Sequence, residues 1–485
     1  MSNISYKSSF LHNKILAFYE KLIFIIYIKK IYISMVRYNC DSCKRFFLKI
    51  ENYEKHLETH QNNTEHEIKY IDLCSGIGGF RVGIENYMGI NPSLRFKCIL
   101  SADIKDDAIK TYNLNFHEDN KKLDIYSIIP KDIPKFDLLC AGFPCQPFSS
   151  AGNKRGFNDK RGGMIFKLLD ICKEHKPNTV LLENVFNLIT LENGKYIQEI
   201  VRLFEEIGYH VYYKKLNSCN FGLAQSRERV YIICTLQKDI SLDDIQYKDD
   251  VFIRDIIDTD DKNTNIDVGF AEKIIELHRK SPLYGCKIGD KRGGNKNIHS
   301  WDIGYHGEIT SEEMKLMNLI LKERRKKHWA IKKNITWMDG MPLTETDIRT
   351  FYDKEELPTM LQNLTSKNYL RLEKCKDLVD GKREYISSSE EGYNICKGKL
   401  SFPISQIMNP DDISPTLTAT DSNKLALIID NQYVRTLNQV ELKRLCGFPD
   451  SYLVPNDVNI YDLFGNMATP PVITELLKVI YNSTS

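Results

Sequence analysis

One cysteine of the chain stands among residues that suit nucleophilic chemistry. Cys145 follows an apolar, strand-like stretch, and Glu183 lies near the end of another. Arg227 and Arg229 come just before a third apolar stretch. A thiolate nucleophile, a carboxyl group and two guanidiniums at strand ends are the groups that attack on an electron-poor ring requires. These residue types therefore predict covalent chemistry at the edge of a sheet.

A glycine-rich turn between an apolar strand and a helix, within residues 69–85, offers a second site. Gly76 and Gly78 let the backbone come close to a ligand. Asp103 follows the next apolar stretch, where acids that bind a ribose stand, and Asp124 lies further along the chain. Many nucleotide folds share such a turn, and acids after strands also occur as plain surface residues. Together these features favour a nucleotide-like ligand.

The elements that must position these groups alternate between strand and helix over residues 70–235. Such alternation predicts an α/β fold with an open, mostly parallel sheet and with ligands at the carboxyl ends of its strands. The apolar stretches expected to form strands include residues 96–100, 136–141 and 179–185.

The composition excludes several classes of protein. With 485 residues, 42% hydrophobic and 27% charged, the chain is neither disordered nor too short for a large core. The formal net charge is only +2, so any nucleic acid must be bound through local basic patches. Thirteen cysteines are too dilute for a disulfide scaffold, which predicts reduced thiols inside the cell. The apolar run at residues 22–28 is too short to span a membrane.

A metal-ligand pattern precedes the glycine-rich turn. Its spacing is Cys-x2-Cys-x12-His-x3-His, and its members are Cys40, Cys43, His56 and His60. Two thiolates on a hairpin, together with two imidazoles at i and i+4 on one helical face, can hold zinc in a tetrahedron. The pattern resembles a two-Cys two-His zinc finger, although Tyr53 stands where that family usually has leucine. One finger reads about three base pairs, so we expect an accessory DNA contact, and a protein-binding role stays open.

Short motifs in a fixed order carry a resemblance to a known family. They are PCQ at 144–146, ENV at 183–185, QSRER at 225–229, RLCGFP at 444–449 and GN at 465–466. In these motifs the chain resembles the DNA cytosine carbon-5 methyltransferases, of the kind found in type II restriction–modification systems. The match runs through residues 70–235 and resumes at 436–450 and 465–473.

The resemblance implies a role for each of the four reactive groups. Cys145 would add to carbon-6 of cytosine, so that carbon-5 becomes able to attack a methyl group. Glu183 would contact ring nitrogen-3 and the exocyclic amine, and Arg229 would hold the carbonyl oxygen. Arg227 would help to order the Cys145 loop and its neighbouring phosphate. Because carbon-5 is inaccessible in a stacked duplex, the base would be flipped into the site.

The resemblance also implies S-adenosylmethionine as methyl donor. The expected pocket residues are Cys74, Ser75, Gly76, Ile77, Gly78, Asp103, Ile104, Asp124, Pro144 and Asn466. Asp103 would bind the ribose hydroxyls and Asp124 the adenine amine, with Asn466 on the far side. Cys74 and Ile104 depart from the family pattern, since many members carry aromatic residues there. These departures predict weaker affinity for the cofactor, although both acids are present.

We expect an α/β, Rossmann-like methyltransferase core with a smaller target-recognition domain and a small zinc-finger module. The expected segments are an N-terminal extension (1–36), the zinc finger (37–62), the core (68–240), the target-recognition region (241–430) and the C-terminal part of the core (431–485). The extension is either poorly ordered or lies before the true start near Met35, and no function is assigned to it. The C-terminal helix, at about 472–482, should fold back onto the core.

The target-recognition region offers a pattern of its own. Apolar residues at Leu357, Met360, Leu361 and Leu364 have helical spacing. Residues 369–372 and 383–386 look like two strands of a hairpin that turns at Asp380-Gly381. Helices that end in a hairpin resemble a winged helix. A basic stretch around Trp329 has two interpretations, a DNA contact or a solvated helical face.

Two other functions compete with methylation of a specific double-stranded DNA sequence. Related enzymes use the same motifs to methylate a tRNA cytosine, and a catalytically silent zinc-finger protein could bind DNA without reacting. The long insert and the finger favour DNA, and the intact reactive groups oppose a silent protein. We therefore expect an intracellular, monomeric enzyme with double-stranded DNA as partner and no membrane contact. A cognate restriction endonuclease would be a genetic partner rather than a physical one. The amino-acid sequence of the recognition region does not identify the DNA sequence that is methylated.

Overall fold

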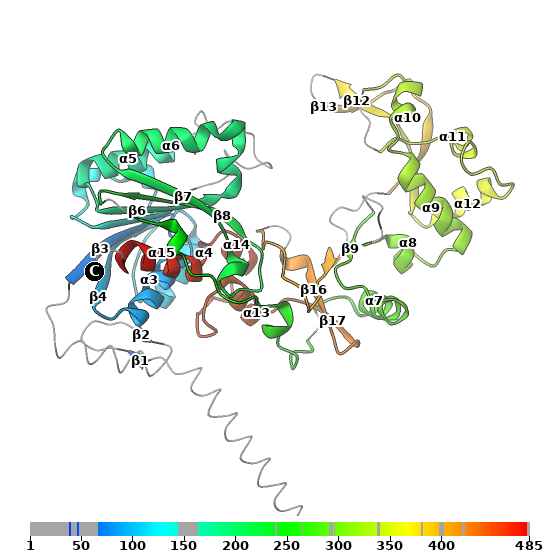
Figure 1. Cartoon of the computed structure of the whole chain (residues 1–485). Coiled ribbons are helices and arrows are strands. Elements are labelled where there is room, and N and C mark those ends of the chain that lie inside the picture. Colours follow the sequence, from blue (N-terminus) through cyan, green and yellow to red (C-terminus); the bar gives the residue numbers. More distant parts are fainter. Residues whose placement is uncertain are drawn as a thin grey trace, which may run out of the picture. The chain divides into compact units, whose positions relative to one another are not determined.

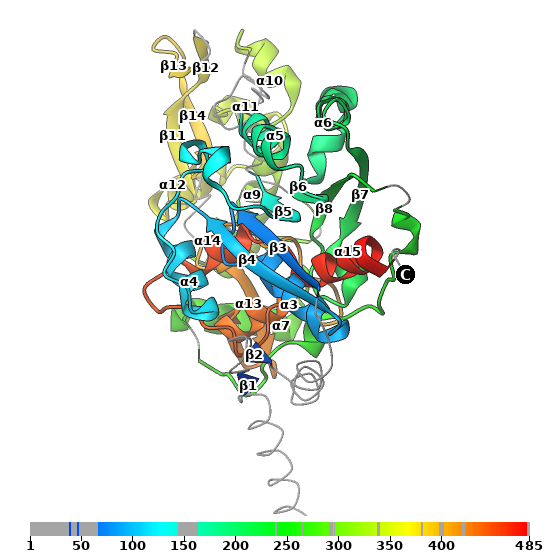
Figure 2. The same cartoon turned by 90° about the vertical axis from the view of Figure 1, so that its left-hand side faces the viewer.

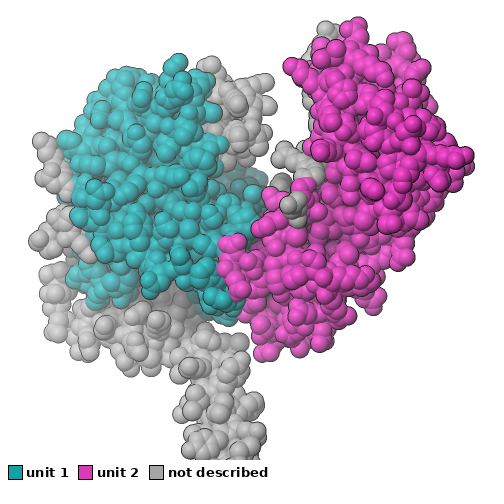
Figure 3. Space-filling model, turned by 45° about the vertical axis from the view of Figure 1, so that its right-hand side comes forward, with its two compact units in different colours: residues 1–256, 413–419, 439–485 teal, residues 257–412, 420–438 magenta. Residues whose placement is uncertain are grey.

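The computed structural model of the chain describes most residues beyond position 65. They are residues 38–39, 46–47, 66–143, 163–237, 240–263, 265–290, 294, 296–336, 340–379, 382–396, 402–419 and 422–482. The contacts divide the chain into two units, coloured in Figure 3. Unit 1 comprises residues 1–256, 413–419 and 439–485, and unit 2 comprises residues 257–412 and 420–438.

A mixed sheet forms the centre of unit 1. Its strands lie in the order β4-β3-β5-β6-β8-β7. Strands β4, β3, β5 and β6 are parallel, and β8 runs antiparallel to both β6 and β7. The strands are β3 (His66–Leu73), β4 (Leu94–Ala102), β5 (Leu138–Gly142), β6 (Thr179–Val185), β7 (His210–Asn217) and β8 (Glu228–Thr235). The expected α/β fold with a mostly parallel sheet is confirmed.

Helices cover both faces of this sheet because successive strand residues point to opposite sides. Ile71 and Leu139 pack in the core that α5 and α6 share, whereas Tyr70 and Leu138 pack in the core beneath α3 and α15. Figure 1 shows these two helix pairs on opposite faces of the sheet. The helices of unit 1 are α3 (Gly79–Ile90), α4 (Asp106–Phe116), α5 (Met164–His175), α6 (Lys195–Glu205), α13 (Gln439–Cys446), α14 (Ile460–Gly465) and α15 (Pro470–Asn482).

The C-terminal helix α15 folds back onto the core of unit 1, as expected. It packs on α3 at Gly83, where an added Cβ would lie 2.6 Å from Cβ of Ile473. The hydroxyl of Thr474 donates to the carbonyl of Gly83 at 3.0 Å. A glycine at this position therefore lets the two helices approach closely, and it anchors the last helix beside the glycine-rich turn.

Unit 2 contains a five-stranded sheet, two hairpin-like strand pairs and a group of helices. The sheet order is β10-β9-β15-β16-β17, and the pairs are β11-β14 and β12-β13. The strands are β9 (Lys287–Ile288), β10 (Asn297–Ile298), β11 (Leu370–Lys374), β12 (Lys376–Val379), β13 (Lys382–Tyr385), β14 (Glu391–Ile395), β15 (Gln406–Ile407), β16 (Leu425–Ile429) and β17 (Tyr433–Thr436). The helices are α7 (Val268–Lys280), α8 (Ser300–Ile303), α9 (Ser311–Glu323), α10 (Lys327–Lys332), α11 (Glu345–Arg349) and α12 (Leu357–Ser366).

The helix predicted from leucine spacing is present as α12, and its four apolar residues are buried. The predicted pairing of residues 369–372 with 383–386 is wrong. Strand β13 pairs instead with β12, and β11 pairs with β14. Val379 lies opposite Lys382, so the turn is at the expected place, although its two residues lie outside the described part. Strand β12 is closer in sequence to β13 than residues 369–372 are, so the loop that joins β12 to β13 is shorter and costs less entropy to close.

The borders of unit 2 differ from those expected at 240/241 and 430/431. Strand β17 pairs with β16, so residues up to 438 belong to unit 2. Residues 413–419 belong to unit 1 because Ser414 forms a parallel bridge with Gln225. Backbone pairing over long sequence distances sets these borders, and composition does not reveal it. Within the described residues, no helix combines the length and the apolar character needed to cross a bilayer.

Candidate active site

The glycine-rich turn after β3 is held in an unusual backbone shape. Cys74, Gly76 and Gly78 have φ angles of 54°, 54° and 78°, in the left-handed region that favours glycine. A Cβ on Gly78 would lie 2.4 Å from the ring of Phe116, whereas no atom lies within 4 Å of a Cβ built on Gly76. The tight side of the turn therefore faces α4, and the open side leaves room for a ligand.

Asp103 ties this turn to the end of β4. Its Oδ2 accepts a hydrogen bond from the Gly76 amide at 2.8 Å, and its Oδ1 accepts from the Lys105 amide at 2.9 Å. The Leu123 amide donates to the Asp103 carbonyl at 3.0 Å, which brings Asp124 to the same edge. The structure thus brings together the turn and both acids that the sequence proposed as cofactor ligands. Open space beside Gly76 and two carboxylates fit an S-adenosylmethionine molecule.

Other predicted pocket residues reach this edge from different segments. The side chain of Ile104 is 56% exposed, so an apolar surface is available to a ligand. Lys105 Nζ donates to Asp462 Oδ2 at 2.7 Å, and Asn466 Nδ2 donates to Asp462 Oδ1 at 2.8 Å. These bonds carry the exposed Asn466 to the Asp103 side of unit 1. Ser75 is buried, and its amide donates to the Ala102 carbonyl at 3.1 Å.

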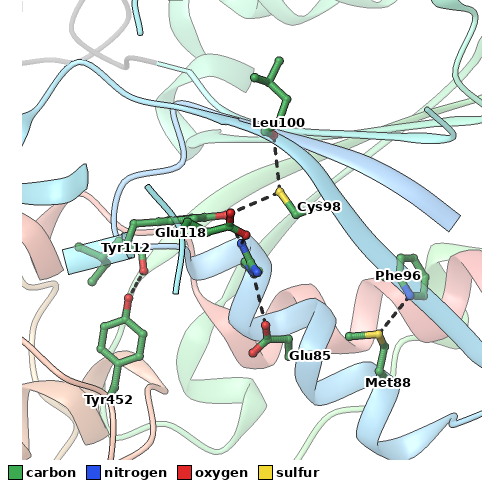
Figure 4. A network of polar contacts seen from close by, with 10 residues as sticks. Glu85, Met88, Phe96, Cys98, Leu100, Tyr112, Glu118 and Tyr452 are labelled. Atoms are coloured by element: carbon green, nitrogen blue, oxygen red, sulfur yellow. Dashed lines mark hydrogen bonds and ion pairs between the residues drawn. The ribbon is translucent and has the colours of Figure 1, made fainter. Parts of the chain in front are cut away.

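The side chains of two residues that the sequence analysis missed, Tyr452 and Arg81, brace the glycine-rich turn and the helices next to it. The Tyr452 hydroxyl donates to the carbonyl of Ile77. Arg81 of α3 donates to the Tyr112 hydroxyl at 3.2 Å and to Glu118 at 2.9 Å (Figure 4). Nothing near position 452 in the sequence signals a contact with a turn more than 370 residues earlier. These hydrogen bonds join α3, α4 and the C-terminal segment around the glycine-rich turn.

Asp72 stands out in the same region because it is fully buried without a partner. Neither carboxylate oxygen has a hydrogen bond among the described residues. Burial raises the pKa of Asp72 to about 8, and the nearby Asp103 carboxylate adds to this, whereas Arg81 opposes it. The native protein therefore holds a proton on Asp72 that the unfolded chain releases at lower pH.

Asp72→Asn is expected to stabilise the protein at pH 8 far more than at pH 5. The native pKa lies above the unfolded value, so wild-type stability falls as pH rises from about 4 to about 8. Asparagine cannot ionise, and the relative gain between the two pH values should be on the order of 3 kcal/mol. Urea unfolding at both pH values measures it. Asp132→Asn, at an exposed position, is the control, and equal pH curves for wild type and Asp72→Asn would contradict the assignment.

Glu183 and Arg229 meet on one face of neighbouring strands. Glu183 of β6 lies opposite Tyr231 of β8, so Arg229, two residues along, shares the face of Tyr231. Arg229 Nε lies 3.0 Å from Glu183 Oε1. Burial raises the pKa of Glu183, while Arg229 and Arg227 oppose the shift.

Arg227 has a different environment from Arg229, although only one residue separates them. It is buried, and its guanidinium donates to carbonyls of Leu417 at 3.3 Å, Gly465 at 3.1 Å and Met467 at 2.8 Å. Burial lowers the pKa of Arg227 to about 10, and neighbouring Arg229 adds to the effect. Arg227 thus ties two distant backbone segments, at residue 417 and at residues 465–467, to the start of β8. Its expected role in ordering the Cys145 loop stays a prediction.

The segment that carries Cys145 and Pro144 lies outside the described residues. Its approach is described, because β5 ends with Gly142 directly opposite Glu183 of β6. Asn184 is buried, and its Nδ2 donates to the Phe143 carbonyl at 3.3 Å. The chain therefore enters the Cys145 segment beside Glu183. Asn184 is a second residue of the ENV motif with a positioning role that the sequence analysis missed.

The four expected zinc ligands Cys40, Cys43, His56 and His60 also lie outside the described residues. Beside them, β1 (Tyr38–Asn39) pairs antiparallel with β2 (Phe46–Phe47). Among the residues that the structure does describe, no group of three or more His, Cys, Asp or Glu side chains is arranged to hold a metal ion. The proposed metal site therefore rests on sequence spacing.

Known proteins match this architecture over most of the chain. The family described as C-5 cytosine-specific DNA methylase matches residues 68–482. The type II methyltransferase M.NlaIV of Neisseria lactamica is 41% identical over 416 residues, which cover 84% of this chain and 97% of that protein. The type II methyltransferase M.BanI of Aneurinibacillus aneurinilyticus is 34% identical over 440 residues, or 86% and 96% of the two chains. By these matches and by its site, the chain belongs to the C-5 cytosine-specific DNA methylase family.

Proposed function

We propose that the protein methylates carbon-5 of cytosine within a specific double-stranded DNA sequence, through a covalent bond between Cys145 and carbon-6 of the ring. The observation that carries the proposal is the Glu183–Arg229 pair, beside the strand end that leads into Cys145. The family match to DNA methylases favours DNA over a tRNA cytosine. Incubation of the full chain and S-adenosylmethionine with unmethylated plasmid DNA should yield 5-methyl-2′-deoxycytidine in nucleoside mass spectrometry. Unmodified DNA with methylated tRNA would overturn the proposal.

The arrangement of the site suggests how each group acts. The Cys145 thiolate attacks carbon-6, and electron density moves toward ring nitrogen-3. Glu183, whose pKa is raised by burial, passes a proton to that nitrogen and limits the charge on the ring. Arg229 donates to the carbonyl oxygen of the base while it stays beside Glu183. Once carbon-5 carries the methyl group, loss of its proton to a base breaks the bond between carbon-6 and sulfur, and the thiolate leaves.

S-adenosylmethionine, when bound, supplies the electrophilic methyl group. Gly76, Asp103 and Asp124 would hold it, because the Gly76 amide donates to Asp103 and the Leu123–Asp103 bond brings Asp124 to the same edge. Ile104 and Asn466 would border it from β4 and the C-terminal segment. Arg227 does not enter this pocket in the proposal. It keeps the C-terminal segment in place through its bonds to the Gly465 and Met467 carbonyls, and it also binds the Leu417 carbonyl.

Asp124→Ala is expected to weaken S-adenosylmethionine binding by about 1–3 kcal/mol, the cost of an unpaired amine in the complex. Isothermal titration calorimetry measures the change directly. Asp119→Ala is a matched control, because Asp119 is an exposed acid five residues earlier on the same segment. If Asp119→Ala weakened binding and Asp124→Ala did not, the adenine contact would belong to Asp119.

We also infer that residues 37–62 bind one zinc ion through Cys40, Cys43, His56 and His60. The spacing of these ligands and the paired strands β1 and β2 at the expected hairpin support the inference. Four cations in this stretch, Lys44, Arg45, Lys49 and Lys55, would contact phosphates.

Removal of residues 1–62 is expected to weaken DNA binding severalfold without changing the methylated sequence. The reason is that the reactive groups all lie between residues 70 and 485, and the finger adds mainly phosphate contacts. Metal analysis should find one zinc per full-length chain and none in the truncated chain. A chelator should have the same effect as truncation. A shorter or different methylated site in the truncated enzyme would make the finger a specificity element.

We propose unit 2 as the target-recognition domain, since its residues 257–412 and 420–438 are inserted in the sequence of the catalytic unit. The enzyme would act as a monomer in the DNA-containing compartment of the cell. The names of its type II relatives suggest a cognate restriction endonuclease as genetic partner. Sedimentation of the full chain with and without duplex DNA tests the monomer, and methylation-sensitive sequencing of host DNA gives the target.

A further inference from the structure

A short segment after α13, residues 449–453, carries a buried tyrosine whose backbone is fixed from two sides. Asn115 of α4 binds Leu453 twice, because its Nδ2 donates to the Leu453 carbonyl at 2.7 Å and its Oδ1 accepts from the Leu453 amide at 2.8 Å. The buried Lys443 of α13 donates to the carbonyl of Tyr452 at 3.2 Å. The backbone around Tyr452 is therefore anchored to α4 on one side and to α13 on the other.

Aromatic contacts fix the ring of Tyr452 as well. Only 2% of Tyr452 is exposed. Its ring centroid lies 4.8 Å from that of Phe448 and 6.3 Å from that of Phe116, and both pairs have the edge-to-face geometry that aromatic rings prefer. Phe116 is also the residue that a Cβ on Gly78 would meet. Tyr452 therefore packs against the same ring that closes the tight side of the glycine-rich turn.

The hydroxyl of Tyr452 donates to the carbonyl of Ile77, in the middle of this turn (Figure 4). Ile77 stands between Gly76 and Gly78, which both have positive φ angles. Glycines lose more conformational freedom than other residues when they are held in one shape, so such a turn needs contacts that fix it. Asp103 holds the Gly76 amide, and Tyr452 holds the next carbonyl along the chain. The two side chains together fix neighbouring peptide groups of the turn.

The segment continues along α4 through weaker contacts. Helices α4 and α14 lie close together in both Figure 1 and Figure 2. The Asn459 amide, just before α14, donates to Asp107 Oδ2 at 3.3 Å. Lys105 Nζ donates to Asp462 Oδ2 at 2.7 Å. These groups are exposed, so each contact adds little to stability. The buried hydroxyl of Tyr452 is therefore the contact through which this segment acts on the turn.

We propose that Tyr452 is a positioning residue for the cofactor, because its hydroxyl keeps the glycine-rich turn in the shape that binds S-adenosylmethionine. When a site takes its binding shape only part of the time, the apparent Kd rises as that fraction falls. The hydroxyl is bound to a backbone carbonyl and not to a reacting group, so it should affect cofactor affinity and not the chemical step. This inference rests on the proposed function, because the cofactor is the methyl donor of that reaction.

The chain offers a matched control for the test. Tyr209 is also 2% exposed, and its hydroxyl donates to the Pro177 carbonyl at 2.8 Å. It lies in the core that α5 and α6 share, with its ring edge-to-face with Phe204 at 6.0 Å. Tyr452→Phe and Tyr209→Phe thus each remove one hydroxyl from a backbone carbonyl and keep the packed ring. Isothermal titration calorimetry of the full chain gives the Kd for S-adenosylmethionine and for S-adenosylhomocysteine. Plasmid methylation at saturating cofactor gives kcat, and thermal unfolding gives the melting temperature.

Tyr452→Phe is expected to raise the Kd for both ligands by the same factor, roughly 2- to 13-fold, which corresponds to one hydrogen bond. The factor should be the same because the two ligands differ only in the transferred methyl group, and kcat should stay unchanged. Tyr209→Phe should lower the melting temperature to a similar extent and change neither Kd. An unchanged Kd in Tyr452→Phe would overturn the inference, as would an equal rise in Tyr209→Phe or a fall in kcat at saturating cofactor. Each of these results, with normal binding by the wild type, leaves the proposed function standing, whereas a wild type that binds no S-adenosylmethionine removes both.

Discussion

Replacing Cys145 with serine is expected to reduce methyl transfer by roughly 10⁴-fold or more, the range seen when an enzyme loses its nucleophile. A serine hydroxyl is almost wholly protonated at neutral pH and does not add to carbon-6. Phe143, which leads into this segment, is held by Asn184, so the substitution should leave the neighbouring sheet intact. Transfer of labelled methyl groups to duplex DNA measures the loss.

DNA binding separates a chemical defect from a folding defect. The Kd of the serine variant for target DNA should stay within about threefold of the wild-type Kd, because the substitution leaves unit 2 and every lysine and arginine side chain unchanged. Cys286→Ser, at a partly buried cysteine of unit 2, should keep its methylation rate. A Cys145→Ser enzyme that methylates at a rate comparable to wild type would show that carbon-5 is activated by another group.

Glu183→Gln is expected to lower kcat by about 10²- to 10⁴-fold, the range for loss of a general acid. Glutamine has nearly the same size but cannot pass a proton to ring nitrogen-3. Burial raises the pKa of the Glu183 carboxyl, which favours its protonated form relative to an exposed glutamate. Single-turnover rates with saturating DNA and S-adenosylmethionine isolate this step from binding.

Stability distinguishes this effect from damage to the sheet. Glutamine keeps the size of the buried side chain but removes the charge that faces Arg229, so the melting temperature should fall modestly, by far less than would explain the loss of rate. Glu192→Gln, at an exposed glutamate in the connection after β6, should change neither rate nor stability. A fall in rate that follows a fall in melting temperature would assign Glu183 to the fold and not to the reaction.

Much of the site followed from the order of strands and motifs. Glu183 and Arg229 stand at ends of apolar stretches, and the sheet brings them to a 3.0 Å contact. The positions of Asp103 and Asp124 beside the glycine-rich turn were likewise predicted from the strands that precede them. The environment of Arg227 did not follow, because its three carbonyl partners come from residues 417, 465 and 467. Sequence spacing indicates which edge a residue reaches, but it does not reveal partners from distant segments.

The structure of unit 2 was less predictable, because the pairing of its short strands depends on contacts with other segments. The helix α12 has a clear hydrophobic period, and its leucines are buried as expected. The strands of the hairpin are short and polar, so their pairing depends on loop length and on neighbours such as Thr336. The basic stretch around Trp329 is both core and surface, because the ring is buried while Lys327 is exposed.

The most direct test of the central claim is capture of the covalent intermediate. The target duplex is prepared with 5-fluorocytosine at the methylated position and incubated with the full-length enzyme and S-adenosylmethionine. Fluorine cannot leave carbon-5 as the proton does, so the bond to the enzyme should persist through denaturation. Mass spectrometry of the digested complex should then place the nucleotide on Cys145. A nucleotide attached to another residue, or no adduct from an enzyme that methylates ordinary DNA, would contradict the mechanism.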